Sequence, residues 1–103
     1  MGTERSPDSP DLAEVRRIVL RGLEGRRARV YLFGSWARGG ASRVSDIDVA
    51  ILPVETLPLG LLAEIQEDLD ESLSLYPVDL VDLSTTSDAF RARVLAEGLP
   101  WTD

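Results

Sequence analysis

FGSWARGGASRVSDIDVAI, residues 33–51, is the stretch of sequence that decides the fold. It joins an apolar segment that ends at residue 33 to another that starts at residue 46, through a loop rich in glycine, serine and arginine. Both segments are short and β-rich, and the first is apolar on both faces, as is typical of a strand covered on both sides. The stretch therefore predicts strands at 29–33 and 46–52, joined by a loop with room for one helical turn.

The flanking sequence predicts three helices and a third strand. Apolar spacing and capping residues place these elements at residues 9–24 (helix), 62–73 (helix), 78–83 (strand) and 88–97 (helix). The order is α-β-β-α-β-α, so we expect an α/β (α+β) domain with a mixed three-stranded sheet backed by helices. A short extra strand fits at the C-terminus. We assign residues 1–8 to a disordered tail and 9–103 to the domain.

Composition limits the chemistry that this chain can carry. Its 103 residues include no cysteine and no histidine, which excludes disulfides, thiolate catalysis and the commonest general base. Chemistry must then rest on carboxylates, hydroxyls, arginines and a hard metal ion. The sequence has no apolar run near the ~20 residues of a membrane span and no signal-like N-terminus, so we expect a cytoplasmic protein without a membrane partner.

Charge is divided unevenly between the two parts of the chain. Residues 1–43 hold nine arginines and five acidic residues, whereas residues 44–103 hold two arginines and thirteen acidic residues. The net charge of −7 argues against an extensive nucleic-acid surface. The division suits a protein that holds a small anion on one side and cations on the other.

Two carboxylates open the second predicted strand. Asp46 and Asp48 are two residues apart, so both project from one face while Ile47, Val49 and Ile51 point to the other. Carboxylates about 7 Å apart repel each other unless a cation lies between them. The core-like surroundings favour a hard cation with oxygen ligands, Mg²⁺ or Mn²⁺.

A third carboxylate follows on the next strand. Asp79 would complete a site for two metal ions, in which one ion holds nucleotide phosphates and the other activates an attacking hydroxyl. Asp82 lies three residues on and faces the other way, so we interpret it as a cap or a solvated residue. The choice of Asp79 over Asp82 is a prediction that the sequence alone leaves open.

A phosphate-binding turn precedes these acids. Gly34 allows close approach of a ligand to the backbone, and Ser35 offers a hydroxyl and an N–H at an expected helix start. Arg38 and Arg43 lie in the same loop and suit phosphate oxygens. A phosphate cradle beside metal-binding carboxylates indicates phosphoryl or nucleotidyl transfer.

The motif resembles that of the DNA-polymerase-β nucleotidyltransferase superfamily, and the chain is most similar to its minimal nucleotidyltransferases. The resemblance covers roughly residues 12–101 and rests on FGSWARGGASRVSDIDVAI and PVDLVDL. It implies that Asp46, Asp48 and Asp79 are catalytic and hold two Mg²⁺ ions, with Mn²⁺ as the alternative. It also implies that Gly34, Ser35 and Arg38 bind ATP.

Family membership implies a function that the residues alone do not. Many minimal nucleotidyltransferases are antitoxins, encoded beside a HEPN-domain toxin that they inactivate by transferring AMP from ATP to a tyrosine. With little chain left for an acceptor domain, the acceptor is expected on a protein partner. The alternatives are a small-molecule or RNA acceptor with a partner subunit, and an antitoxin that only binds.

Several side chains keep two interpretations. Trp36 either covers the nucleotide base or packs, and Trp101 is either core or an exposed partner contact. Four other aromatic residues are read as core: Tyr31, Phe33, Tyr76 and Phe90. The acidic face of the second long helix is either solvated or docks a basic partner.

Overall fold

The computed structural model describes residues 10–38, 46–72 and 76–102, so the predicted tail at 1–8 and Arg43 lie outside the described residues. The elements are α1 (Pro10–Gly22), β1 (Ala28–Phe33), α2 (Ser35–Arg38), β2 (Ile47–Pro53), α3 (Leu61–Asp70), β3 (Val78–Asp82), the 3-10 turn η1 (Leu83–Thr85), α4 (Asp88–Glu97) and β4 (Leu99–Pro100). The predicted fold class and the order of the main elements are confirmed.

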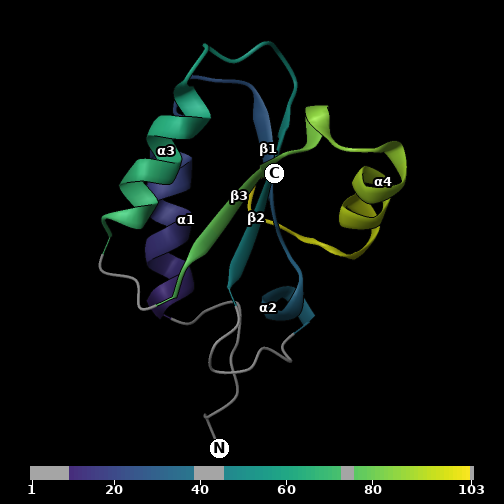
Figure 1. The fold of residues 1–103 in the computed structure, drawn as a ribbon, viewed down its shortest axis with the longest axis horizontal. Helices are drawn as coiled ribbons and strands as arrows, with labels where there is room; N and C mark the ends of the chain where they lie inside the picture. Colours follow the sequence, from purple (N-terminus) through teal and green to yellow (C-terminus); the bar gives the residue numbers. More distant parts are fainter. Residues whose placement is uncertain (1–9, 39–45, 73–75, 103) are drawn as a thin grey trace, which may run out of the picture.

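The sheet has the strand order β3-β2-β1-β4. Strand β2 pairs antiparallel with β1 and parallel with β3, and α3 makes the crossover that a parallel pair requires. Helices α1 and α3 lie on one side of the sheet and α4 lies on the other (Figure 1). The predicted three strands become four because the short C-terminal strand β4 adds to the free edge of β1.

The C-terminal segment is fastened to β1 beyond the two paired residues of β4. The Trp101 N–H donates to the Val30 carbonyl at 2.7 Å, and the Val30 N–H donates to Thr102 Oγ1 at 3.2 Å. The Arg16 guanidinium of α1 donates to the Trp101 carbonyl at 3.3 Å. The indole of Trp101 is buried in the core, so its interpretation as an exposed contact is wrong.

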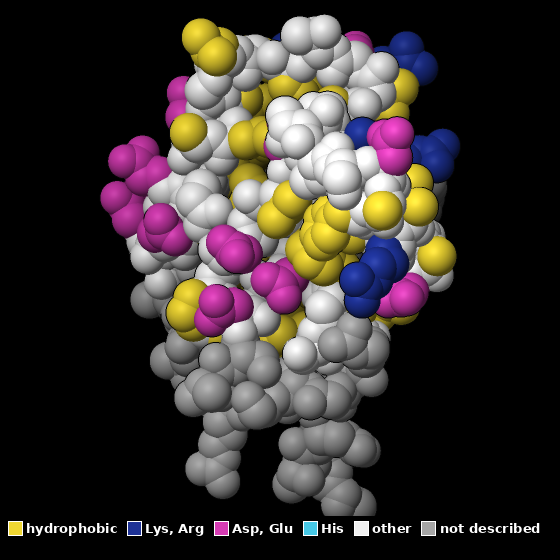
Figure 2. Space-filling view, turned by 45° about the vertical axis from the view of Figure 1, so that its right-hand side comes forward, with side chains coloured by type: hydrophobic (Ala, Val, Ile, Leu, Met, Phe, Trp, Pro, Cys, Tyr) yellow, Lys and Arg dark blue, Asp and Glu magenta, His cyan; other side chains and the backbone are white. Residues whose placement is uncertain are grey.

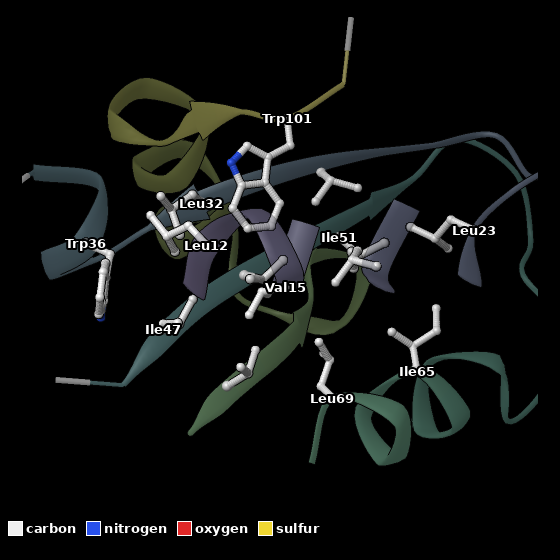
Figure 3. Packing of buried hydrophobic residues seen from close by; sticks show 14 residues of the cluster. Leu12, Val15, Leu23, Leu32, Trp36, Ile47, Ile51, Ile65, Leu69 and Trp101 are labelled. Atoms are coloured by element: carbon white, nitrogen blue, oxygen red, sulfur yellow. The ribbon is translucent and has the colours of Figure 1, made fainter. Parts of the chain in front are cut away.

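The core divides into two clusters, one on each face of the sheet. Ile47, Val49 and Ile51 of β2 are fully buried in the larger cluster, against residues of α1 and α3 (Figure 3). Ala50 lies in the smaller cluster, with Val94 of α4. The alternation predicted for this strand is confirmed. Its odd-numbered side chains face α1 and α3, and its even-numbered side chains face the side on which α4 lies.

The aromatic residues differ in part from the sequence interpretation. Trp36 is 1% exposed and packs edge-on against Tyr76, with ring centroids 5.0 Å apart, so it is a packing residue and does not cover a nucleotide base. Tyr76, Phe33 and Phe90 are only half-buried because they lie at the ends of their elements or beside them, where the core thins out.

Helix α4 turns a narrow apolar face to the sheet. Val94 is buried in the smaller cluster, whereas the adjacent Leu95 is 42% exposed. In the described ranges, no helix combines the length and apolar character needed to cross a membrane.

The central position of β2 gives a test of the fold. Ile51→Ala should lower the free energy of unfolding by about 2–5 kcal/mol, because it leaves a cavity among fully buried neighbours. The fully exposed Leu59 provides a matched control, and Leu59→Ala should change stability by less than about 0.5 kcal/mol. Urea unfolding followed by circular dichroism measures both, and equal losses would contradict the assignment of the core.

Candidate active site

Three residues form a row across the face of the sheet on which α4 lies. In the ladder, Asp48 of β2 is paired with Asp79 of β3 on one side and with Phe33 of β1 on the other. Directly paired residues project from the same face of a sheet, so the two carboxylates are neighbours. The register thus brings together Asp48 and Asp79, two of the three acids that the sequence singled out.

Asp46 stands just before β2 rather than inside it. The strand begins at Ile47, whose N–H donates to the Pro77 carbonyl at 2.9 Å, one residue later than predicted. Asp46 and Asp79 are exposed, whereas Asp48 is half-buried. The three acids therefore differ in solvation, and Asp48 is the one that the fold encloses.

The electrostatic environment of Asp48 is unfavourable to its charge. Burial raises the pKa of the Asp48 carboxyl above its usual 3.8, and the nearby carboxylates of Asp79 and Asp46 raise that pKa further. Each of these effects disfavours the charged form, and a cation at the same place would favour it. Carboxylate oxygens are the ligands that Mg²⁺ prefers, so the chemistry of the donors fits a hard divalent cation.

The three acids are not drawn together into a finished metal centre. Within the part of the chain that the structure describes, no group of three or more acidic side chains lies close enough to hold a metal ion as it stands.

Gly34 brings the backbone against the Asp48 carboxylate. It has a φ of +77°, and a Cβ atom built on it would lie 2.5 Å from Asp48 Oδ2. Both facts require glycine here, one for the left-handed backbone and the other for the close approach. Ser35 follows as the first, half-buried residue of the single helical turn α2. Arg38 ends that turn, and its side chain is outside the described part of the chain.

Gln66 of α3 holds the strand that carries Asp79. Its amide group donates to the Val78 carbonyl at 2.8 Å and accepts from the Leu80 N–H at 3.1 Å, so it pairs with the backbone on both sides of Asp79. Strand β3 is the edge of the sheet, and these two bonds satisfy backbone groups that an edge leaves free. No motif in the sequence points to this role of Gln66.

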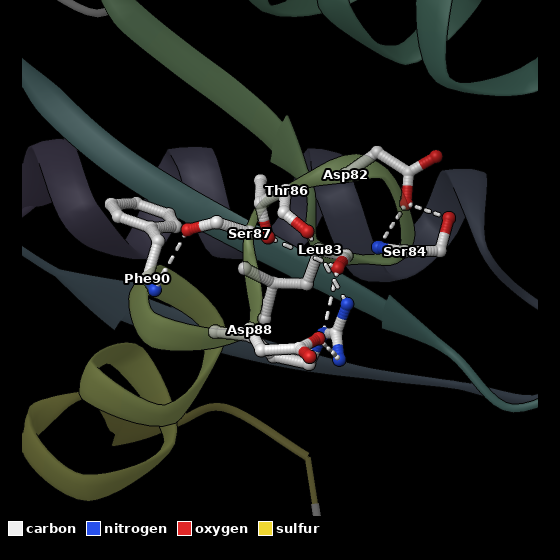
Figure 4. Close-up of polar contacts among 8 residues, drawn as sticks. Asp82, Leu83, Ser84, Thr86, Ser87, Asp88 and Phe90 are labelled. Atoms are coloured by element: carbon white, nitrogen blue, oxygen red, sulfur yellow. Dashed lines mark hydrogen bonds and ion pairs between the residues drawn. The ribbon is translucent and has the colours of Figure 1, made fainter.

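Asp82 has a structural task of its own. Its Oδ1 accepts from the Ser84 N–H at 2.9 Å and from Ser84 Oγ at 2.6 Å, and so caps the 3-10 turn η1 (Figure 4). In the register of the sheet it is paired with Ile51, three residues along β3 from Asp79. The structure therefore confirms the interpretation of Asp82 as a capping residue.

A pocket of about 160 Å³ lies between the end of β1 and α4, and its residue Gly34 is the one that approaches the Asp48 carboxylate. Two of its residues end β1 or follow it, and the others come from α4: Phe33, Gly34, Phe90, Arg93, Val94 and Glu97. Phe33 and Phe90 meet edge to face, with ring centroids 5.7 Å apart. The sequence predicts the helix itself but not its position over the end of β1, because that position depends on long-range contacts.

This geometry agrees with what comparison with known proteins finds. Residues 26–100 match the polymerase beta nucleotidyltransferase family, and the chain belongs to that family. It is 39% identical to the protein adenylyltransferase MntA of Shewanella oneidensis over 69 residues, which are 67% of this chain and 49% of that protein. The chain spans about half the length of the curated relatives it matches.

Solved structures of toxin–antitoxin pairs share the fold. One is a toxin–antitoxin with AMP-PNP, with a TM-score of 0.67, 31% identity and coverage of 84% of this chain and 72% of that one. Another is a tri-AMPylated Shewanella oneidensis HEPN toxin in complex with MNT antitoxin, with a TM-score of 0.64, 26% identity and coverage of 89% and 69%. The resemblance to minimal nucleotidyltransferases is thereby confirmed.

The contact between Gly34 and Asp48 can be tested against a matched glycine. Gly25 has a nearly equal φ of +81° and open space around it. Gly25→Ala should cost about 1–2 kcal/mol from the left-handed backbone alone. Gly34→Ala should cost at least about 1 kcal/mol more, because its methyl group displaces the Asp48 carboxylate. Chemical denaturation compares the two variants, and equal losses would show that the close approach does not matter.

The raised pKa of Asp48 predicts how stability depends on pH in buffer without divalent cations. Because the folded protein binds this proton more tightly than the unfolded chain, stability falls as pH rises from 3.8 through the raised folded-state pKa. Asp48→Asn does not titrate, so it should be more stable than wild type at pH 7. Urea unfolding midpoints should converge as the pH approaches 3.8, and a difference independent of pH would contradict this electrostatic origin.

Proposed function

We propose that this protein is an Mg²⁺-dependent nucleotidyltransferase that transfers AMP from ATP to a tyrosine hydroxyl of a HEPN-type toxin, and that it acts as the antitoxin of the pair. The observation that carries the proposal is the register of Asp48 with Asp79, with the Gly34 backbone against the Asp48 carboxylate. This places acids beside a turn that admits phosphate to the backbone.

We assign to the residues of the motif the roles that the family resemblance implies. Asp46, Asp48 and Asp79 hold two Mg²⁺ ions, and Mn²⁺ has the same ligand chemistry. When bound, these ions neutralise phosphate charge and lower the pKa of the attacking hydroxyl. Gly34, Ser35 and Arg38 hold the phosphates that leave.

The transfer itself exchanges one phosphorus–oxygen bond for another. The tyrosine oxygen bonds to the α-phosphorus of ATP, while the bond from that phosphorus to the bridging oxygen breaks and pyrophosphate departs. Asp79 accepts the proton of the hydroxyl, because it is the exposed acid at the edge of the sheet and an incoming acceptor reaches it first. Asp48, half-buried, stays in place to hold the cations.

The relatives support the nucleotide and the partner. MntA of Shewanella oneidensis is a protein adenylyltransferase, and solved relatives are a toxin–antitoxin with AMP-PNP and an AMPylated HEPN toxin with its MNT antitoxin. These names belong to those proteins. Their extension to this chain rests on the shared fold and on the acids at its site.

The two acids of β3 provide a sharp test of the reaction. Asp79→Asn should lower AMP transfer at least about 1,000-fold, because it removes the proton acceptor and a cation ligand together. Asp82→Asn is the matched control: asparagine can keep the cap on η1, so activity should remain within about twofold of wild type. The measurement is the intact mass of the HEPN toxin encoded beside this gene after incubation with ATP and Mg²⁺.

The same assay separates the competing functions. A toxin that gains AMP with wild type but not with Asp79→Asn supports the proposal. A toxin that forms a silenced complex without gaining mass would establish an antitoxin that only binds. Transfer of label from ATP to an aminoglycoside or RNA, with no transfer to the toxin, would establish a different acceptor.

A further inference from the structure

Among the described residues, Arg93 of α4 is a cation that has no ion-pair partner, and it lies near the end of β1 that faces Asp48. It lines the same pocket as Gly34 and is exposed. Among the described residues it makes no hydrogen bond or ion pair, although Glu97 lies one turn further along α4. In the space-filling view, several acidic side chains lie to the left of an apolar patch, while basic and acidic side chains lie next to each other on its right (Figure 2).

The nearby Arg91, on the same helix, has a structural role. Its guanidinium donates to the Leu83 carbonyl at 3.0 Å and to the Thr86 carbonyl at 3.3 Å, and it pairs with Asp88 at 3.1 Å. These bonds tie α4 to the turn that precedes it. Arg93 has no such task, so its position over the pocket is not explained by the stability of the helix.

The residues of the site are arranged in order across the strands of the sheet. Asp79 lies on the edge strand β3, Asp48 on β2, Gly34 at the end of β1, and Arg93 beyond it on α4. The acids Asp79 and Asp48 thus lie toward the β3 edge, and Arg93, with Glu97 one turn along the helix, lies at the α4 end. In nucleotidyl transfer the attacking and leaving oxygens lie roughly in line through the phosphorus, so acceptor and leaving group occupy opposite ends.

We propose that Arg93 binds the β- and γ-phosphates of ATP and the pyrophosphate that leaves, from the α4 side of the pocket that Gly34 also lines. This inference rests on the proposed function, since it takes ATP as the ligand. The acceptor then approaches over Asp79, at the acidic end. A guanidinium offers paired donors to phosphate oxygens, and Arg93 has all of its donors available.

The experiment measures binding rather than transfer. Calorimetric titration in Mg²⁺ compares ATP, pyrophosphate and AMP on wild type, Arg93→Gln and Arg93→Lys. Arg93→Gln should weaken ATP and pyrophosphate about tenfold and leave AMP within about twofold, because AMP lacks the two outer phosphates. Arg93→Lys should recover part of the affinity, since it keeps the charge but loses the paired donors.

Two further variants serve as controls. Arg29→Gln removes the same charge from the opposite end of β1, on an exposed residue, and should leave all three affinities unchanged. Glu97→Gln removes the anion nearest Arg93 along the helix and should bind ATP at least as tightly as wild type. Unfolding midpoints near that of wild type would show that each variant is folded.

Each outcome decides between the two proposals. Unchanged ATP affinity in Arg93→Gln, or equal losses for ATP and AMP, would overturn the phosphate assignment. Wild type that binds neither ATP nor pyrophosphate would overturn both that assignment and the proposed function. If the binding pattern is as predicted but no AMP is transferred to the toxin, only the proposed transfer would be overturned. The role of Arg93 would stand, because it is tested by the affinity for ATP and pyrophosphate and not by transfer.

Discussion

The alternation of side chains along β2 is the constraint on which the rest of the structure depends. Its three large aliphatic residues are fully buried on one face, so the register of the strand is fixed by the core. A slip of one residue in the pairing would move Asp48 into that core and expose the three aliphatic residues, which would strongly destabilise the folded domain. The hydrophobic face therefore places the acid, and the parallel pairing with β3 places Asp79 beside it.

The position of Asp48 disfavours the charged form of its carboxyl group. Burial and two neighbouring carboxylates raise the pKa of Asp48, and Gly34 presses its backbone against the same side chain. Neither feature stabilises the folded chain by itself. Residues that break local rules in this way are found at functional sites, where a ligand supplies the compensation. Here a divalent cation and a phosphate chain would supply it.

The sequence predicted what is encoded locally and missed what depends on distant contacts. The alternation around Asp48 identified the strand and its polar face, and the three-residue spacing from Asp79 led to the interpretation of Asp82 as a cap or a solvated residue. Gln66 could not be identified, because its two bonds join α3 to the edge of β3 across twelve and fourteen residues. Trp36 sits within the motif loop, and only its packing on Tyr76 distinguishes a core residue from a ligand contact.

Charge on either side of the site gives the proposed reaction its direction. The outward face of α3, which flanks β3, carries four acids at helical spacing: Glu64, Glu67, Asp68 and Glu71. Under the proposed function, this charge would disfavour ATP on the α3 side, and Arg93 of α4 would attract it. The α3 side would then be left to the acceptor, whose hydroxyl would reach Asp79 at the β3 edge of the sheet. Under the proposed function, these acids and Arg93 would separate the entrance for the nucleotide from the entrance for the acceptor, although all of them belong to the acidic part of the sequence, residues 44–103.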